Sequence, residues 1–304
     1  MIYEKVYINK TAYADAYILN RKISYQTSRR RPLIIICPGG AYLFKATKEG
    51  ECVAMEFLSR GYHTVVLQYT SYFRKRVDLA AEKPELNPES HFPLQMLELM
   101  ETIQRIHQKS EDWYVDTKNI FVIGFSAGAH IAASLGVHWN EECYKTQLSM
   151  KPIAKELKPR GLVLAYPLLN GSPAGYMAGL AEESRDIKAQ LPYMNAAVTG
   201  KENPTEADLE PLDIIRNIND DVPPVFIWHT YQDQITDPRN SILLAAKLLK
   251  ENIPCEFHLF PEGHHGMGLC NEVAAKSEGD VNKKCQKWVE FADEWMKGLV
   301  KNDK

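Results

Sequence analysis

A serine between two glycines is the first residue of this 304-residue chain whose type and setting could do chemistry. Ser126 stands in Gly-Phe-Ser-Ala-Gly, after the β-branched run 120–123 and before an alanine-rich run with apolar residues at helical spacing. The pattern predicts a buried strand, a sharp turn and a helix, with Ser126 on the turn. Glycines suit such a turn because it leaves no room for neighbouring side chains. The plain alternative is a tight turn without chemistry.

As a nucleophile, the Ser126 hydroxyl would need a general base, and this base would need a partner that fixes its tautomer. In a strand-turn-helix arrangement of this kind the chain order is serine, acid, histidine. Asp233 follows the apolar run 223–230 and is the predicted acid. Asp237 is the alternative, but its place directly before Pro238 suits a helix N-cap.

Two adjacent histidines, His264 and His265, follow the predicted strand 255–260 in a glycine-bounded loop. One of them is the predicted base, and the residue types alone do not separate them. A zinc site is disfavoured because neighbouring side chains in a loop rarely face one ion, and no cysteine or carboxylate pair with ligand spacing lies nearby. We expect no metal and no cofactor.

Backbone donors for a developing oxyanion are predicted in Cys-Pro-Gly-Gly-Ala-Tyr, residues 37–42, which follows another buried run. Glycines let the main chain approach a ligand closely. The predicted donors are the N–H groups of Gly40, Ala41 and Ala127, the last of these from the turn after the serine. The alternative is a simple connection from strand to helix.

The elements that must position these residues alternate between strand and helix patterns, which predicts a mostly parallel sheet with helices on both faces. An antiparallel pair of strands is expected at its N-terminal edge, over residues 2–8 and 13–19. The candidate residues then lie at the carboxyl ends of the parallel strands. Residues 1–304 are predicted to form one domain, with a small cap inserted at about 170–213, where the segment is polar and only weakly helical. The remaining expected strands are 32–37, 63–69, 119–124, 161–167, 223–230 and 255–260, and the expected helices are 47–61, 92–113, 127–139, 238–252 and 285–300.

Composition limits the partners. The chain is 45% hydrophobic and 25% charged with a formal net charge of −3, so a nucleic acid or an anionic membrane surface is not expected as a partner. A small-molecule ester fits better, and a homodimer is left open. Six cysteines without C-x-x-C spacing predict reduced thiols. The start of the sequence lacks signal-peptide features and no stretch is apolar enough to span a membrane, so a cytoplasmic location is expected.

Together these motifs resemble the α/β-hydrolase superfamily, specifically the small carboxylesterases grouped with acetyl esterases and acetyl-xylan-esterase-like enzymes. The resemblance covers most of the chain, from Pro32 to Leu269. It implies the α/β-hydrolase fold, a Ser126–Asp233–His265 triad with the base directly before a glycine, and an oxyanion loop at the first glycine pair. Two positions depart from the pattern, because alanines stand at 41 and 129 where such enzymes often carry glycine.

The resulting hypothesis is a serine carboxylesterase that hydrolyses short acyl esters, chiefly acetyl, on sugars or oligosaccharides. A serine peptidase of the prolyl-oligopeptidase type shares the fold and the triad order, although this chain has no repeat-bearing region before the hydrolase part. A non-catalytic protein that keeps the pocket for a small ligand is the other alternative.

Overall fold

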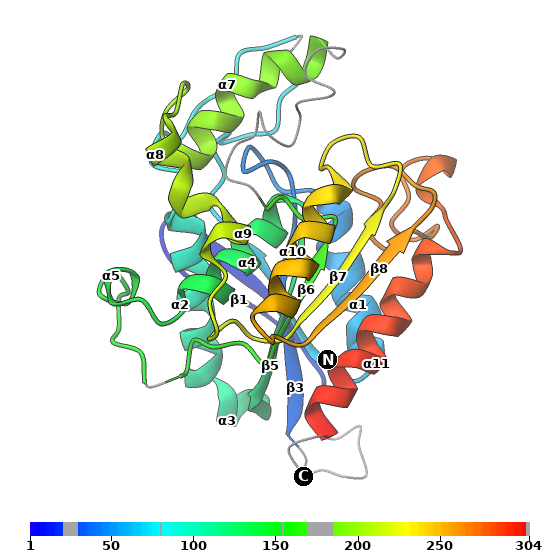
Figure 1. The fold of residues 1–304 in the computed structure, drawn as a ribbon. Coiled ribbons are helices and arrows are strands. Elements are labelled where there is room, and N and C mark those ends of the chain that lie inside the picture. The colour runs from blue at the N-terminus through cyan, green and yellow to red at the C-terminus, as the bar shows by residue number, and fades with distance from the viewer. Residues whose placement is uncertain (21–29, 80, 154, 170–184, 302–304) are drawn as a thin grey trace.

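The computed structural model describes residues 1–20, 30–79, 81–153, 155–169 and 185–301. Its strands form one eight-stranded sheet in the order β1-β2-β4-β3-β5-β6-β7-β8 (Figure 1). The strands are β1 (Ile2–Tyr7), β2 (Tyr13–Ile18), β3 (Arg31–Cys37), β4 (His63–Gln68), β5 (Val115–Phe125), β6 (Gly161–Ala165), β7 (Val225–Thr230) and β8 (Cys255–Phe260).

The sheet is parallel from β4 through β8, whereas β1 pairs antiparallel with β2 and β2 pairs antiparallel with β4. The predicted α/β-hydrolase fold, with its antiparallel N-terminal strands, is therefore confirmed. Strand β5 begins at Val115, earlier than the predicted Asn119, because Val115 pairs with Arg31 across a register shift. The polar residues after Val115 conceal this irregular extension in the sequence.

Two helical layers cover the sheet because its strands bury side chains on both faces. In β3, Leu33 and Ile35 belong to one core cluster, and Ile34 and Ile36 belong to the other. The longer helices are α1 (Glu51–Ser59), α2 (Leu94–Gln108), α4 (Ala127–His138), α7 (Arg185–Thr199), α10 (Pro238–Lys250) and α11 (Trp288–Lys301). The first cluster includes residues of α2, α4 and α10, and the second includes residues of α1 and α11, on the opposite face (Figure 1). The short helices are η2 (Thr47–Glu49), α3 (Ser110–Trp113), α5 (Glu142–Lys145), α8 (Glu206–Leu209), η3 (Glu210–Leu212), α9 (Ile214–Asn217), η4 (Glu278–Asp280) and η5 (Cys285–Lys287).

Helix α4 matters most for the site because it starts directly after Ser126. All twelve of its residues are buried, as expected for a helix that is apolar on every side. The helix and strand β5 therefore hold the serine on rigid elements. Within the described residues, no helix combines the length and the apolar character that crossing a bilayer would require.

The segment predicted as a cap lies partly outside the described residues, which resume at 185. Helix α7 lies beyond the carboxyl ends of the strands (Figure 1). It continues through Pro192 to Thr199, although the sequence of this segment is only weakly helical, because Met194 and residues 196–198 are buried. The backbone of Phe92 donates to the carbonyl of Val198 at 3.0 Å, so this helix packs against the chain that leads into α2.

Candidate active site

Ser126 lies on a strained turn between β5 and α4. Its backbone has φ 51° and ψ −116°, values that a residue with a side chain adopts only where the surroundings enforce them. A Cβ atom at Gly124 would lie 2.4 Å from the carbonyl oxygen of Gly128, and a Cβ atom at Gly128 would lie 2.0 Å from that of Cys37. Both glycines are therefore required by close backbone approach, as the motif predicted.

A hydrogen-bonded chain joins Ser126 to His265 and Asp233, which come from the loops after β5, β8 and β7. His265 Nε2 lies 2.8 Å from Ser126 Oγ, and His265 Nδ1 lies 2.7 Å from Asp233 Oδ2. This is the geometry in which an imidazole can take the proton of a hydroxyl while a carboxylate holds its tautomer.

The structure separates the two adjacent histidines. His264 turns away from Ser126, and its Nε2 lies 2.9 Å from Asp280 Oδ1. The His264 side chain is 51% exposed, whereas that of His265 is 16% exposed. Only His265 therefore reaches the serine.

Asp233 is held in place from both sides of its carboxylate. Oδ1 accepts the backbone N–H groups of Ile235 and Thr236 at 2.8 and 3.0 Å, and Oδ2 lies 3.0 Å from Nε2 of His229 in addition to its contact with His265. Burial by itself raises the pKa of the Asp233 carboxyl. The charge of His265 and the hydrogen bonds from both histidines outweigh burial and hold this pKa well below its usual range.

Asp237, the alternative acid, caps helix α10 instead. Its side chain accepts the backbone N–H of Arg239 at 2.9 Å and forms an ion pair with the Arg239 guanidinium. This is the N-cap role that its place before Pro238 indicated.

Two polar residues beside Asp233 were not predicted from the sequence, namely His229 and Thr236. His229 is fully buried at the end of β7, where its Nδ1 contacts Ser241 Oγ at 2.8 Å. Thr236 Oγ1 lies 3.1 Å from both Asp233 Oδ2 and His265 Nδ1. The available signal was a histidine at the end of an otherwise apolar strand, four residues before the acid.

The glycine loop after β3 lies against the serine. A Cβ atom at Gly39 would lie 3.0 Å from Ser126 Cβ. Gly40 has φ 123° and Ala41 has φ 54°, so consecutive residues depart from the ordinary backbone regions and turn the chain sharply. In the described part of the chain the N–H groups of Gly40 and Ala41 have no protein acceptor. Ala127, the first residue of α4, has an N–H that the helix itself cannot satisfy.

The aromatic side chains near the site belong to the core. Tyr42, Phe125, Tyr166 and Trp228 are each at most 1% exposed. Beside the triad, a surface hollow of about 840 Å³ is lined by Asp233, His265 and the residues around them. The other lining residues are Tyr231, Gln232, Gln234, Ile235, Gly263 and His264.

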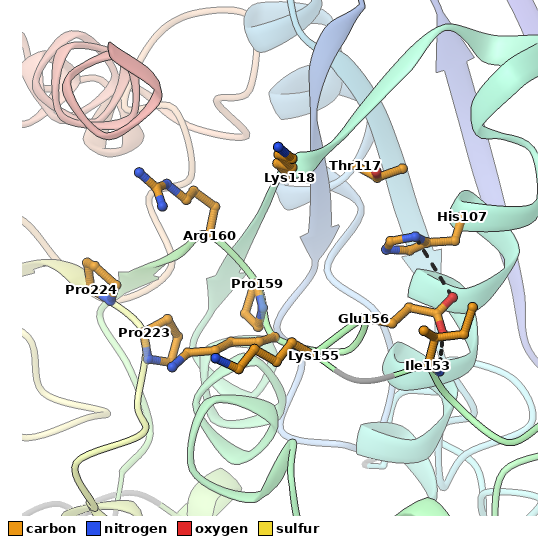
Figure 2. Close-up of a pocket in the computed structure, with 11 residues that line it drawn as sticks. His107, Thr117, Lys118, Ile153, Lys155, Glu156, Pro159, Arg160, Pro223 and Pro224 are labelled. Atoms are coloured by element: carbon orange, nitrogen blue, oxygen red, sulfur yellow. Dashed lines mark hydrogen bonds and ion pairs between the residues drawn. The ribbon is translucent and has the colours of Figure 1, made fainter. Parts of the chain in front are cut away.

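A second hollow, of about 620 Å³, lies at the opposite edge of the sheet, where Arg160 precedes β6 and Pro224 precedes β7 (Figure 2). Figure 2 shows the carboxylate of Glu156 between His107 and the backbone of Ile153, whose N–H it accepts at 2.8 Å. Ser126, Asp233 and His265 are not among the residues that line this hollow.

Comparison with known proteins places the chain in a family. The family model described as BD-FAE matches residues 22–248. Endo-1,4-beta-xylanase B of Butyrivibrio fibrisolvens is 28% identical over 245 residues, which are 80% of this chain and 33% of that enzyme, so the chain spans about a third of that relative's length.

Solved structures share the fold over nearly the whole chain. Carboxylesterase Cest-2923 of Lactobacillus plantarum WCFS1 has a TM-score of 0.79 at 24% identity, with 98% of each chain covered. The acetyl ester-xyloside bifunctional hydrolase of Caldicellulosiruptor lactoaceticus has a TM-score of 0.71 at 24% identity, with 98% of this chain and 96% of that chain covered.

Proposed function

The chain belongs to the BD-FAE family, and from this premise we propose that it is a carboxylic ester hydrolase that uses Ser126 as its nucleophile. The observation that carries the proposal is the hydrogen-bonded chain from Ser126 Oγ through His265 to Asp233. A protein that only binds a ligand has no need of a strained serine aligned with a base and a buried carboxylate.

In the proposed acylation step, His265 Nε2 takes the proton of Ser126 Oγ as the oxygen attacks the ester carbonyl carbon. Asp233 holds the imidazole with its Nε2 free to accept and stabilises the imidazolium that forms. The N–H groups of Gly40, Ala41 and Ala127 are the proposed donors to the oxyanion, and loss of one such donor typically costs about 10²–10³ in kcat.

Collapse of the tetrahedral intermediate breaks the bond to the alcohol, which leaves with the proton from His265. Water then attacks the acyl group on Ser126, His265 takes a proton from this water, and a second collapse releases the acid and restores the serine hydroxyl. The cycle uses only groups of this chain and water.

We propose short acyl groups, chiefly acetyl, on a sugar or oligosaccharide as the substrate class. The relative from Butyrivibrio is named a xylanase, and a protein of the same fold is named for acetyl ester and xyloside hydrolysis. The hollow beside His265 also suits a sugar, because Tyr231 is 70% exposed in its wall and Gln232 and Gln234 bring amides that can bond hydroxyl groups.

A cytoplasmic location remains part of this proposal, and it would limit the substrate to small imported esters. Fractionation of the source cells tests it, since most of the activity in the culture medium would contradict it.

The experiment that tests the proposed function compares the purified protein with its Ser126→Ala variant on the acetyl, butyryl and octanoyl esters of nitrophenol and on acetylated xylo-oligosaccharides. We expect the acetyl ester to be cleaved and the variant to lose at least about a thousandfold. Equal rates in both proteins, or cleavage of a prolyl peptide in place of the esters, would contradict the proposal. Optimal activity on the octanoyl ester would contradict the short-acyl part alone.

A further inference from the structure

A carboxyl group is buried between the two loops that flank Ser126. Glu49, at the end of η2, is 2% exposed. Its Oε2 accepts the backbone N–H of Gly39 at 2.7 Å, and its Oε1 accepts the hydroxyl of Tyr166 at 2.7 Å. Gly39 directly precedes the proposed oxyanion donors, so one carboxylate oxygen is bonded to the loop that carries them.

Tyr166 connects the same carboxyl group to the histidine loop. Its hydroxyl oxygen accepts the backbone N–H of Gly268 at 3.0 Å, so its own proton is free to go to Glu49. Its ring meets the His265 ring edge-on, with centroids 4.9 Å apart. Its carbonyl oxygen accepts the Thr236 hydroxyl at 3.1 Å, so Tyr166 also contacts the loop that carries Asp233.

A parallel connection runs beside this one through Asp280. Lys48, next to Glu49, lies 3.1 Å from the Asp280 carboxylate, which also pairs with His264. The η2 segment is thus tied twice to the loop that carries His265.

The contacts of Glu49 require an acceptor at both oxygens. Burial raises the pKa of Glu49 above its usual range, although the hydrogen bonds from Tyr166 and Gly39 and the charge of His265 act in the opposite direction. Both donors lie at distances typical of bonds to a charged oxygen.

We propose that Glu49 and Tyr166 are a positioning pair that sets the oxyanion loop against the histidine loop. This inference rests on the proposed hydrolase function. The carboxylate fixes the peptide of Gly39, so the next N–H groups along the loop face the carbonyl oxygen of the ester. Tyr166 contacts both Glu49 and the His265 ring, so the proton acceptor and the oxyanion donors keep a fixed position relative to each other.

Two variants test the pair without changing the size of the side chains much. In the wild type the Gly39 N–H and the Tyr166 hydroxyl each donate to one oxygen of Glu49. The glutamine of Glu49→Gln has one oxygen and one NH₂ group in these places, so either Gly39 or Tyr166 loses its acceptor. Tyr166→Phe keeps the ring on His265 but removes the hydroxyl between Glu49 and Gly268. We expect each to lower kcat by about 10–100-fold, less than complete loss of an oxyanion donor, with KM changed by less than about threefold.

The fold offers a close control in Tyr62, which is 1% exposed like Tyr166 and donates its hydroxyl to buried Asp293 at 2.9 Å. Tyr62→Phe removes a hydroxyl from an equally buried tyrosine–carboxylate pair that contacts no catalytic loop. Glu98→Gln does the same for a buried carboxyl, since Glu98 accepts Thr70 and Asn9 instead. We expect wild-type kcat in both controls once thermal melting shows that they are folded.

The pH profile separates positioning from a general loss of structure. The charges of Glu49 and His265 attract each other, so loss of the Glu49 charge should move the acid limb of kcat/KM to lower pH in Glu49→Gln. Tyr166→Phe keeps the carboxylate and should leave that limb in place. An unchanged limb in Glu49→Gln, or kcat losses of equal size in Tyr62→Phe, would overturn the proposal.

Labelling of Ser126 by a fluorophosphonate probe distinguishes this proposal from the function on which it rests. We expect fast labelling of the wild type and slow labelling of Glu49→Gln and Tyr166→Phe. Equal labelling rates in all of these proteins would refute the positioning pair but keep the nucleophile. A wild type that is not labelled would refute the proposed function itself, and the positioning pair with it.

Discussion

Replacement of Asp233 by asparagine should abolish catalysis for a reason visible in the backbone around it. The N–H groups of Ile235 and Thr236 both donate to Oδ1, so the amide oxygen of the asparagine must take that place. Its NH₂ group then faces the imidazole of His265. The opposite orientation would leave the two backbone donors without an acceptor, at about 1–3 kcal/mol each. In the first orientation His229 Nε2 still has the Thr236 carbonyl oxygen at 3.0 Å, so the first orientation is favoured by about 30-fold or more.

An NH₂ group beside Nδ1 of His265 requires that this nitrogen accept. The proton then moves to Nε2, the atom 2.8 Å from Ser126 Oγ, and the base becomes a donor to the serine. We expect kcat for nitrophenyl acetate to fall about 10⁴-fold, the cost of the wrong tautomer in a serine triad. Nitrogen NMR of the imidazole should show the Nε2–H tautomer in the variant and Nδ1–H in the wild type.

Asp237→Asn is the matched control, because asparagine caps a helix about as well as aspartate. Its kcat should equal that of the wild type. A variant of Asp233 with kcat within tenfold of the wild type, or an equal loss in Asp237→Asn, would refute the assignment of the acid and the reasoning about the amide.

Three further predictions follow from close contacts, burial and charge. Gly128→Ala should destabilise the fold by about 3 kcal/mol or more, because the added Cβ atom would lie 2.0 Å from a backbone atom. Gly298→Ala in α11, where an added Cβ atom meets nothing within 4 Å, should stabilise the fold by about 0.5–1 kcal/mol. Melting temperatures that change in the same direction in both variants would contradict this prediction. The pKa of Asp233 is lower in the folded chain than in the unfolded chain, so its charge stabilises the fold above about pH 4, and this stabilisation is lost as the pH falls further. The difference in the free energy of unfolding between wild type and Asp233→Asn, measured in urea, should therefore shrink from pH 6 to pH 3. A difference that stays constant over this range would refute the prediction. Tyr231→Ala should raise KM for acetylated xylo-oligosaccharides several-fold and leave KM for nitrophenyl acetate unchanged. Tyr7→Ala, which replaces a tyrosine of the same 70% exposure on β1, should change neither KM value. An equal change in KM for both substrates would argue against a sugar site in the hollow.

Local patterns were enough to predict the architecture. Apolar runs marked the parallel strands closely, and the order of motifs placed the serine, the acid and the histidine at their carboxyl ends. The N-cap role of Asp237 could be predicted from the sequence because N-capping depends only on the start of a helix. The sequence failed at the early start of β5, since pairing with Arg31 overrides the polar residues there.

The contacts that join distant segments were decided only by the tertiary structure. The residue types left two candidates for the proposed base, and His265 is favoured because His264 pairs with Asp280 in the folded chain. The carboxylate of Glu49 and the hydroxyl of Tyr166, 117 residues apart, meet beneath the site, and His229 gains its importance from the turn that brings Asp233 back over it. The physical reason is that periodicity and turn chemistry depend on neighbours along the chain. The partner of a buried polar group depends instead on how strands, helices and loops far apart in the sequence are packed together.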